Sequence, residues 1–100
     1  FACVLECVPA ALASKITQEL TTMATIGIGA GNGCDGQVLV CNDLLGVSDG
    51  FCPKFVKRYA DIHSITVNAV KSYINEVKDR SFPAPEHTFK IDDTVLEKLY

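Results

Sequence analysis

The chain has 100 residues, of which 48% are hydrophobic, and its formal net charge at pH 7 is −3. This length accommodates one small domain, and the apolar content excludes a generally disordered polypeptide. Since the lysines and arginines form no basic run and no apolar segment approaches the ~20 residues of a membrane span, the sequence predicts neither a nucleic-acid partner nor a membrane protein.

The first predicted element is a strand over residues 1–5, because a short continuous apolar run is typical of a parallel strand covered on both faces. A helix is predicted directly after Pro9, a residue that suits the first turn of a helix because an N–H there has no intrahelical partner. Leu12, Ile16 and Leu20 recur every fourth residue, which is the spacing of one face of a helix.

A second strand is predicted over residues 25–29, followed by a glycine-rich turn. Asp35 is then a candidate N-cap for a helix over residues 36–45, and Gly46 is suited to end that helix in the left-handed conformation. Residues 38–40 are also compatible with a strand, and local pattern leaves both possibilities open. The flanking cap residues favour the helix.

The third strand is predicted over residues 55–59, and Ser64 is the expected cap of a long helix that ends before the proline-rich segment 82–85. A last short helix is expected within residues 94–99. This alternation of strands and helices predicts an α/β protein with a parallel sheet. The apolar face of the long helix comprises Ile65, Ala69, Val70, Tyr73, Ile74 and Val77.

Two features suggest that the chain is a piece of a longer protein. Three parallel strands leave open sheet edges, which are prone to aggregation. The chain also begins at Phe1, inside an apolar run. It has neither an initiator methionine nor a signal-peptide pattern there. Its five cysteines lack zinc-binding spacing and lie mostly in apolar runs, so we expect reduced thiols and a cytoplasmic location.

The glycine-rich segment matches neither of two common phosphate-binding patterns. The P-loop pattern fails because Gln37 and Val38 stand where lysine and serine or threonine are required, and the dinucleotide fingerprint lacks its third glycine. Gly27, Gly29 and Gly31 instead occupy every second position, so one face of the strand end is expected to carry no side chains. Such a face admits either a ligand or a closely packed neighbouring backbone.

Several segments resemble the ketopantoate hydroxymethyltransferase family: VLECVPAALA, IGIGAGNGCDGQVLV, NDLLG, PKFVKRYAD and FPAPEHTF. They follow the family's order over nearly the whole chain, and IGIGAG followed by DGQVLV is the most specific. Asn32 and Asn42 depart from the proline and histidine that the family often has at these positions. Neither position is expected to be catalytic.

The resemblance implies a (β/α)₈ TIM barrel of the phosphoenolpyruvate/pyruvate superfamily, with residues 1–100 as the C-terminal part of a single domain that covers about the last three β/α units. It implies transfer of a hydroxymethyl group from 5,10-methylenetetrahydrofolate to 3-methyl-2-oxobutanoate, giving ketopantoate in pantothenate and coenzyme A biosynthesis. It also implies Mg²⁺, with its ligands in the family's N-terminal part and none in this chain, and a cytoplasmic homo-oligomer, a decamer.

Glu6 is the candidate catalytic residue. It follows an apolar run at the predicted end of the first strand, where TIM barrels carry their active sites. Partial burial there would raise the pKa of its carboxyl group, and a raised pKa suits a general base. By resemblance, Glu6 is the base that removes the C3 proton of the keto acid; from the residues alone, a helix cap or an ion-pair partner is the alternative.

Other polar residues receive weaker assignments. Asp35 is expected to cap a helix rather than bind a ligand, and one of Lys57 and Arg58 is expected to point into the barrel. The remaining expectations are a helix-surface or backbone-bonding role for Asp43, a solvated side chain for His63, and a tail-anchoring role for His87.

Two further functions are compatible with the sequence. One is a non-catalytic structural or regulatory α/β module that folds alone or self-associates to complete its sheet. The other is an enol-chemistry barrel of the phosphoenolpyruvate mutase or isocitrate lyase type, which the IGIGAG and DGQVLV segments disfavour.

Overall fold

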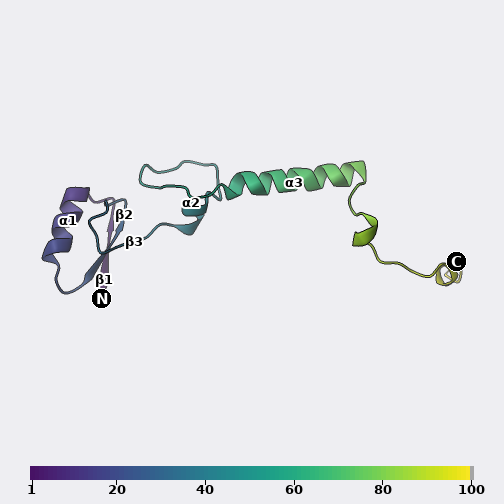
Figure 1. Cartoon of the computed structure of the whole chain (residues 1–100), viewed down its shortest axis with the longest axis horizontal. Helices are drawn as coiled ribbons and strands as arrows, with labels where there is room; N and C mark the ends of the chain where they lie inside the picture. Colours follow the sequence, from purple (N-terminus) through teal and green to yellow (C-terminus); the bar gives the residue numbers. More distant parts are fainter. Residues whose placement is uncertain (100) are drawn as a thin grey trace. The chain divides into compact units, whose positions relative to one another are not determined.

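The computed structural model describes residues 1–99 and is shown in Figure 1. The chain divides into two compact units, residues 1–64 and the residues from 65 on. In chain order, the elements are β1 (Ala2–Glu6), α1 (Ala10–Glu19), β2 (Ala24–Ile28), β3 (Gly36–Gln37), α2 (Cys41–Leu45), α3 (Ile62–Asp79), the 3₁₀ turn η1 (Pro85–His87) and α4 (Asp93–Leu96).

The first unit contains a parallel sheet with the strand order β1-β2-β3. This confirms the α/β class and the first two predicted strands. The register pairs Val4 with Ile26 and Glu6 with Ile28. Because paired residues of parallel strands point to the same side and side chains alternate along a strand, these four residues share one face of the sheet. Thr25 lies on the other face, which α1 covers.

Helix α1 follows Pro9 as predicted, and Ile16 and Leu20 of its apolar face are half-buried. Leu12 is 49% exposed, whereas Ala13 is fully buried. The helix approaches the glycine loop so closely that a Cβ added at Gly31 would lie 2.5 Å from the Ala10 Cβ. Only small side chains fit between such near neighbours, so the packed face consists of Ala10, Ala13, Ser14 and Thr17.

The predicted helix over residues 36–45 is wrong in its first part. Gly36–Gln37 form the short strand β3, which pairs with β2, and only Cys41–Leu45 are helical. Asp35 caps no helix because its carboxylate bonds to Thr25 on β2 instead. The prediction for Gly46 is confirmed, since it ends α2 with a φ of 61°.

The predicted strand over residues 55–59 is also wrong, because this segment is a turn followed by an irregular stretch. Arg58 Nη2 donates a hydrogen bond to the Gly50 carbonyl at 3.1 Å, and Lys57 Nζ lies 4.8 Å from the centre of the Tyr59 ring. Neither cation therefore occupies a strand. The third parallel strand of the described sheet is β3.

The long predicted helix is confirmed as α3, but its start differs. The cap is Asp61 rather than Ser64: the Asp61 carboxylate accepts a hydrogen bond from the Ser64 amide at 3.0 Å. Hydrogen bonds from Ser64 also hold the pKa of Asp61 below its usual value.

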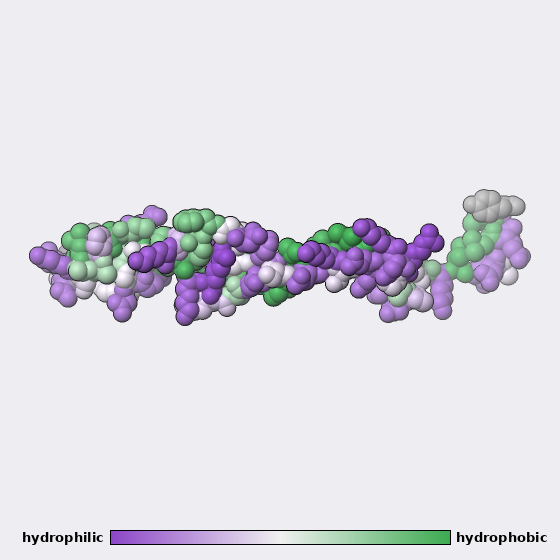
Figure 2. Space-filling view, turned by 90° about the horizontal axis from the view of Figure 1, so that it is seen from above, coloured by the Kyte–Doolittle hydropathy of each residue, from purple (hydrophilic) through white to green (hydrophobic). Residues whose placement is uncertain are grey.

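The second unit carries the predicted apolar face of α3 on its surface, where Ile65 is 64% and Tyr73 is 56% exposed. Figure 2 shows this hydrophobic surface on α3 among hydrophilic side chains. The Phe82 ring lies 5.6 Å from Tyr73 and 5.1 Å from His87, centre to centre. The last predicted helix is confirmed as the shorter α4. Among residues 1–99, no helix is both long and apolar enough to cross a bilayer.

Candidate functional site at the strand ends

The carboxyl ends of β1 and β2 lie side by side. The Cys7 amide, directly after Glu6, donates a hydrogen bond of 2.9 Å to the carbonyl of Ile28, the last residue of β2. Gly29 then begins the glycine loop of residues 29–35. The structure thus brings Glu6 and the glycine loop to the same end of the sheet, as ligand sites of α/β folds require.

Glu6 lies on the sheet face opposite α1, together with Val4. Its side chain is exposed, and Val4 on the same face is 59% exposed. The partial burial predicted for the carboxylate is therefore not found within this chain, because β1 is an edge strand and its free face has no cover among residues 1–99.

The two alternative roles of Glu6 are not found within residues 1–99. The N-terminus of α1 has no side-chain cap. The ion pairs of the described chain join Lys15 to Glu19 and His63 to Asp49, and neither involves Glu6. The carboxylate thus has no structural partner in the part of the chain that the structure covers.

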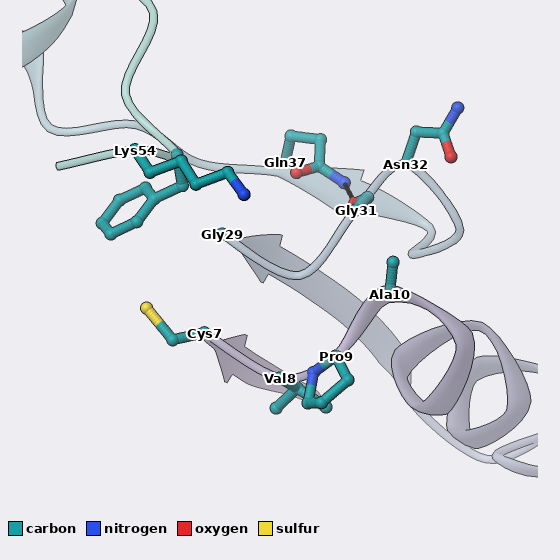
Figure 3. Close-up of a pocket in the computed structure, with 10 residues that line it drawn as sticks. Cys7, Val8, Pro9, Ala10, Gly29, Gly31, Asn32, Gln37 and Lys54 are labelled. Carbon is teal, nitrogen blue, oxygen red and sulfur yellow. Dashed lines mark hydrogen bonds between the residues drawn. The ribbon is translucent and has the colours of Figure 1, made fainter.

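A cavity of about 800 Å³ opens at this end of the sheet and is shown in Figure 3. Its walls are the turn of residues 7–10, the glycine loop, Gln37 and the segment with Lys54 and Phe55. The Gln37 amide donates a hydrogen bond to the Gly31 carbonyl at 2.8 Å, and the Lys54 amine points toward the loop. Glu6 is not among the residues that line this cavity.

The glycine loop packs closely on neighbouring side chains and also lines the cavity. Gly29 and Gly31 lie beyond β2 with φ values of 64° and 78°, so they do not form the expected side-chain-free strand face. A Cβ at Gly29 would lie 2.9 Å from the Phe55 ring, and one at Gly31 would meet Ala10. The glycines are therefore required for close packing within the chain.

Asp35 anchors the loop from its far end. One carboxylate oxygen accepts a hydrogen bond from the Thr25 amide at 2.8 Å and lies 3.1 Å from the Thr25 hydroxyl. That hydroxyl is 2.7 Å from the hydroxyl of Thr17, which in turn donates to the Ala13 carbonyl. Thr25 is fully buried, so this network joins β2, α1 and the loop around one buried polar residue.

The remaining candidates lie away from the strand ends. Asp43 is a half-buried residue of α2. The predicted solvated side chain of His63 is not what the structure shows. His63 lies in the first turn of α3, and its Nε2 is 3.4 Å from an Asp49 carboxylate oxygen. In the second unit, His87 Nδ1 accepts a hydrogen bond from the Ala84 amide at 3.1 Å.

One residue of the cavity could not be predicted from the local sequence. Lys54 lines the cavity, although nothing in its local pattern distinguishes it from a surface lysine. The five cysteines are all free thiols. Within residues 1–99 no group of three or more His, Cys, Asp or Glu side chains could hold a metal ion.

Comparisons with known proteins agree in one family. Residues 1–85 match the family model described as ketopantoate hydroxymethyltransferase. Over 100 residues, the whole chain is 59% identical to a 3-methyl-2-oxobutanoate hydroxymethyltransferase of Enterococcus faecalis and 55% identical to one of Clostridium novyi, and it covers 36% of each of these proteins. A protein of the same name from Nitratidesulfovibrio vulgaris is 56% identical over 97 residues, which cover 97% of the chain and 31% of that protein. The chain thus spans about a third of the length of these relatives.

Proposed function

Because the chain belongs to the ketopantoate hydroxymethyltransferase family, we propose that it is part of an enzyme that transfers a hydroxymethyl group to 3-methyl-2-oxobutanoate, giving ketopantoate. The proposed donor is 5,10-methylenetetrahydrofolate, and the proposed pathway is pantothenate biosynthesis. We further propose that the enzyme is a cytoplasmic homo-oligomer, in accordance with the family resemblance of the sequence. The match over residues 1–85 argues against a phosphoenolpyruvate mutase or isocitrate lyase.

We propose that the sheet is part of a (β/α)₈ barrel and that the chain is the C-terminal part of that domain. Two observations support the barrel. The strands are parallel, with α1 on one face, as in the wall of such a barrel. The opposite face carries the apolar side chains of Val4, Ile26 and Ile28, and Val4 is 59% exposed. An uncovered apolar face of this kind fits the interior of a closed barrel.

In the proposed reaction, Glu6 is the general base. The C3–H bond of the keto acid breaks, the proton goes to the Glu6 carboxylate, and the electron pair forms the enolate that attacks the methylene carbon of the folate. Water supplies the hydroxyl group of the product, and tetrahydrofolate leaves. The observation that carries this role is the position of Glu6 at the carboxyl end of β1, on the same face as Ile28. Closure of the barrel over this face would remove water from the carboxylate and make it a stronger base.

We assign no ligand of the proposed magnesium ion to the residues of this chain. We propose that the ligands of the magnesium ion belong to other parts of the enzyme. The contribution of this chain is therefore the base and one wall of the pocket.

The test is exchange of the C3 proton of 3-methyl-2-oxobutanoate with D₂O, followed by NMR on the full-length protein. Exchange isolates proton removal, because it needs no folate. Glu6→Gln should slow exchange on the order of 10²- to 10⁴-fold, the usual contribution of a general base. Glu19→Gln is the matched control, because Glu19 is an exposed residue of α1. Exchange at the wild-type rate in Glu6→Gln would remove Glu6 from the proposed role.

A further inference from the structure

The residue that follows the proposed base has a left-handed backbone. The φ of Cys7 is 53°, and the only other left-handed residue among residues 1–99 that is not glycine is Arg80. Arg80 directly follows α3, where left-handed residues commonly end helices. Cys7 follows a strand instead and therefore needs a different explanation.

The left-handed turn links two constraints on Glu6. On its N-terminal side, β1 is held in register by pairing, with Leu5 opposite Gly27 and Glu6 opposite Ile28. On its C-terminal side, the Cys7 amide donates a hydrogen bond of 2.9 Å to the Ile28 carbonyl. The backbone of Glu6 is thus held to β2 on both sides.

The turn also sends the chain away from the Glu6 side chain. Helix α1 begins at Ala10, only a few residues after β1 ends, and it packs on the sheet face opposite Glu6. The chain must change direction within this short distance, and the left-handed residue makes that change at once. An extended residue at position 7 would continue the strand and shift the residue before it.

We propose that Cys7 is a positioning residue for Glu6: its left-handed backbone, bonded to the Ile28 carbonyl, fixes the direction in which the Glu6 side chain leaves the strand. The inference rests on the proposed role of Glu6. A residue with a Cβ adopts this conformation unfavourably and persists in it only where the surrounding structure holds it. The thiol is exposed at the cavity and makes no bond that the positioning requires.

The test is a series of variants at position 7 that separates backbone conformation from thiol chemistry. Cys7→Gly and Cys7→Asn favour the left-handed region, Cys7→Ser keeps the side-chain size without the thiol, and Cys7→Val disfavours the left-handed region most strongly. The readout is kcat and KM for C3-proton exchange of 3-methyl-2-oxobutanoate by the full-length protein. Cys41→Val is the matched control, because Cys41 is an exposed cysteine at the start of α2.

We expect the Gly, Asn and Ser variants to keep kcat within about three-fold of wild type. Cys7→Val should lower kcat roughly 10- to 100-fold with little change in KM, since a misplacement of about 1 Å is enough for such a loss. A wild-type kcat in Cys7→Val, or a Ser variant as impaired as Val, would overturn the inference.

Two further outcomes keep the inference separate from its premise. If Cys7→Val does not fold, the Asn and Ser variants still decide, because a large loss of kcat in either contradicts a backbone role. Glu6→Gln is measured in parallel. Wild-type exchange in Glu6→Gln refutes the proposed base itself, whereas loss of exchange there with normal exchange in Cys7→Val refutes only the positioning role.

Discussion

Removal of the Asp35 side chain should destabilise the glycine loop and the start of β2 without touching the proposed base. The Asp35 carboxylate accepts the hydrogen bond from the Thr25 amide, and Thr25 is fully buried. In Asp35→Ala this amide loses its partner inside the protein. The Thr25 hydroxyl keeps its 2.7 Å contact with the Thr17 hydroxyl, so the hydroxyl loses less hydrogen bonding than the amide does.

The expected loss follows from these contacts. A buried donor without a partner destabilises the folded state by about 1–3 kcal/mol. Because Asp35 itself is exposed, water can enter the vacated space and restore part of the bonding, which places the expected value at about 1–2 kcal/mol. Asp35→Asn keeps an oxygen acceptor but loses its charge, so we expect roughly half of this effect.

The assay is urea denaturation of the full-length protein, combined with hydrogen exchange of the Thr25 amide. The free energy of unfolding should fall with an unchanged m-value, and the Thr25 amide should lose protection. Glu19→Ala is the control, because Glu19 has only an exposed pair with Lys15 at 3.9 Å. If Asp35→Ala unfolds at the same urea concentration as this control and the Thr25 amide stays protected, the network does not anchor the loop.

One further substitution tests the loop, and a pKa measurement tests the start of α3. Gly31→Ala should destabilise the protein by about 1–3 kcal/mol in thermal or urea unfolding, because φ is 78° and the new Cβ would meet Ala10. Gly50→Ala is the control, because a Cβ at position 50 would have its nearest neighbour 3.9 Å away, and it should change the stability little. Equal destabilisation by the two substitutions would contradict the packing argument. The pKa of Asp61 by NMR should lie below 3.8, because the bonds from Ser64 favour its charged form. The stability that this cap contributes is present above the unfolded-state pKa and lost as the pH falls through the lowered folded-state pKa, so a normal pKa would refute the cap.

Sequence patterns predicted the elements whose signals are local. The apolar run at the start of the chain became β1, Pro9 preceded α1, and a long apolar stripe became α3. Patterns misassigned the segment after Asp35, where Gly36–Gln37 form β3, and residues 55–59, which form a turn and an irregular stretch. The choice between them depended on which segment reached the edge of β2, and that is a long-range contact.

In the candidate site, too, some features follow from local sequence signals and others from long-range contacts. The apolar run before Glu6 was enough to predict a carboxylate at a strand end, and the family resemblance rested on motifs within this chain. The face on which Glu6 lies came from the pairing register with β2. The left-handed backbone of Cys7 and the place of Lys54 beside the cavity had no local signal at all.

The sequence by itself therefore determined the family, the strand and helix types of the strongly patterned segments, and the candidate base. The tertiary structure alone decided the strand register, the bonding of Asp35 to Thr25, and the close packing that makes Gly29 and Gly31 necessary. The physical reason is the range of the interactions. Hydrophobic periodicity and capping act between residues a few positions apart, whereas register, burial and close approach arise between segments that meet only when the chain is folded.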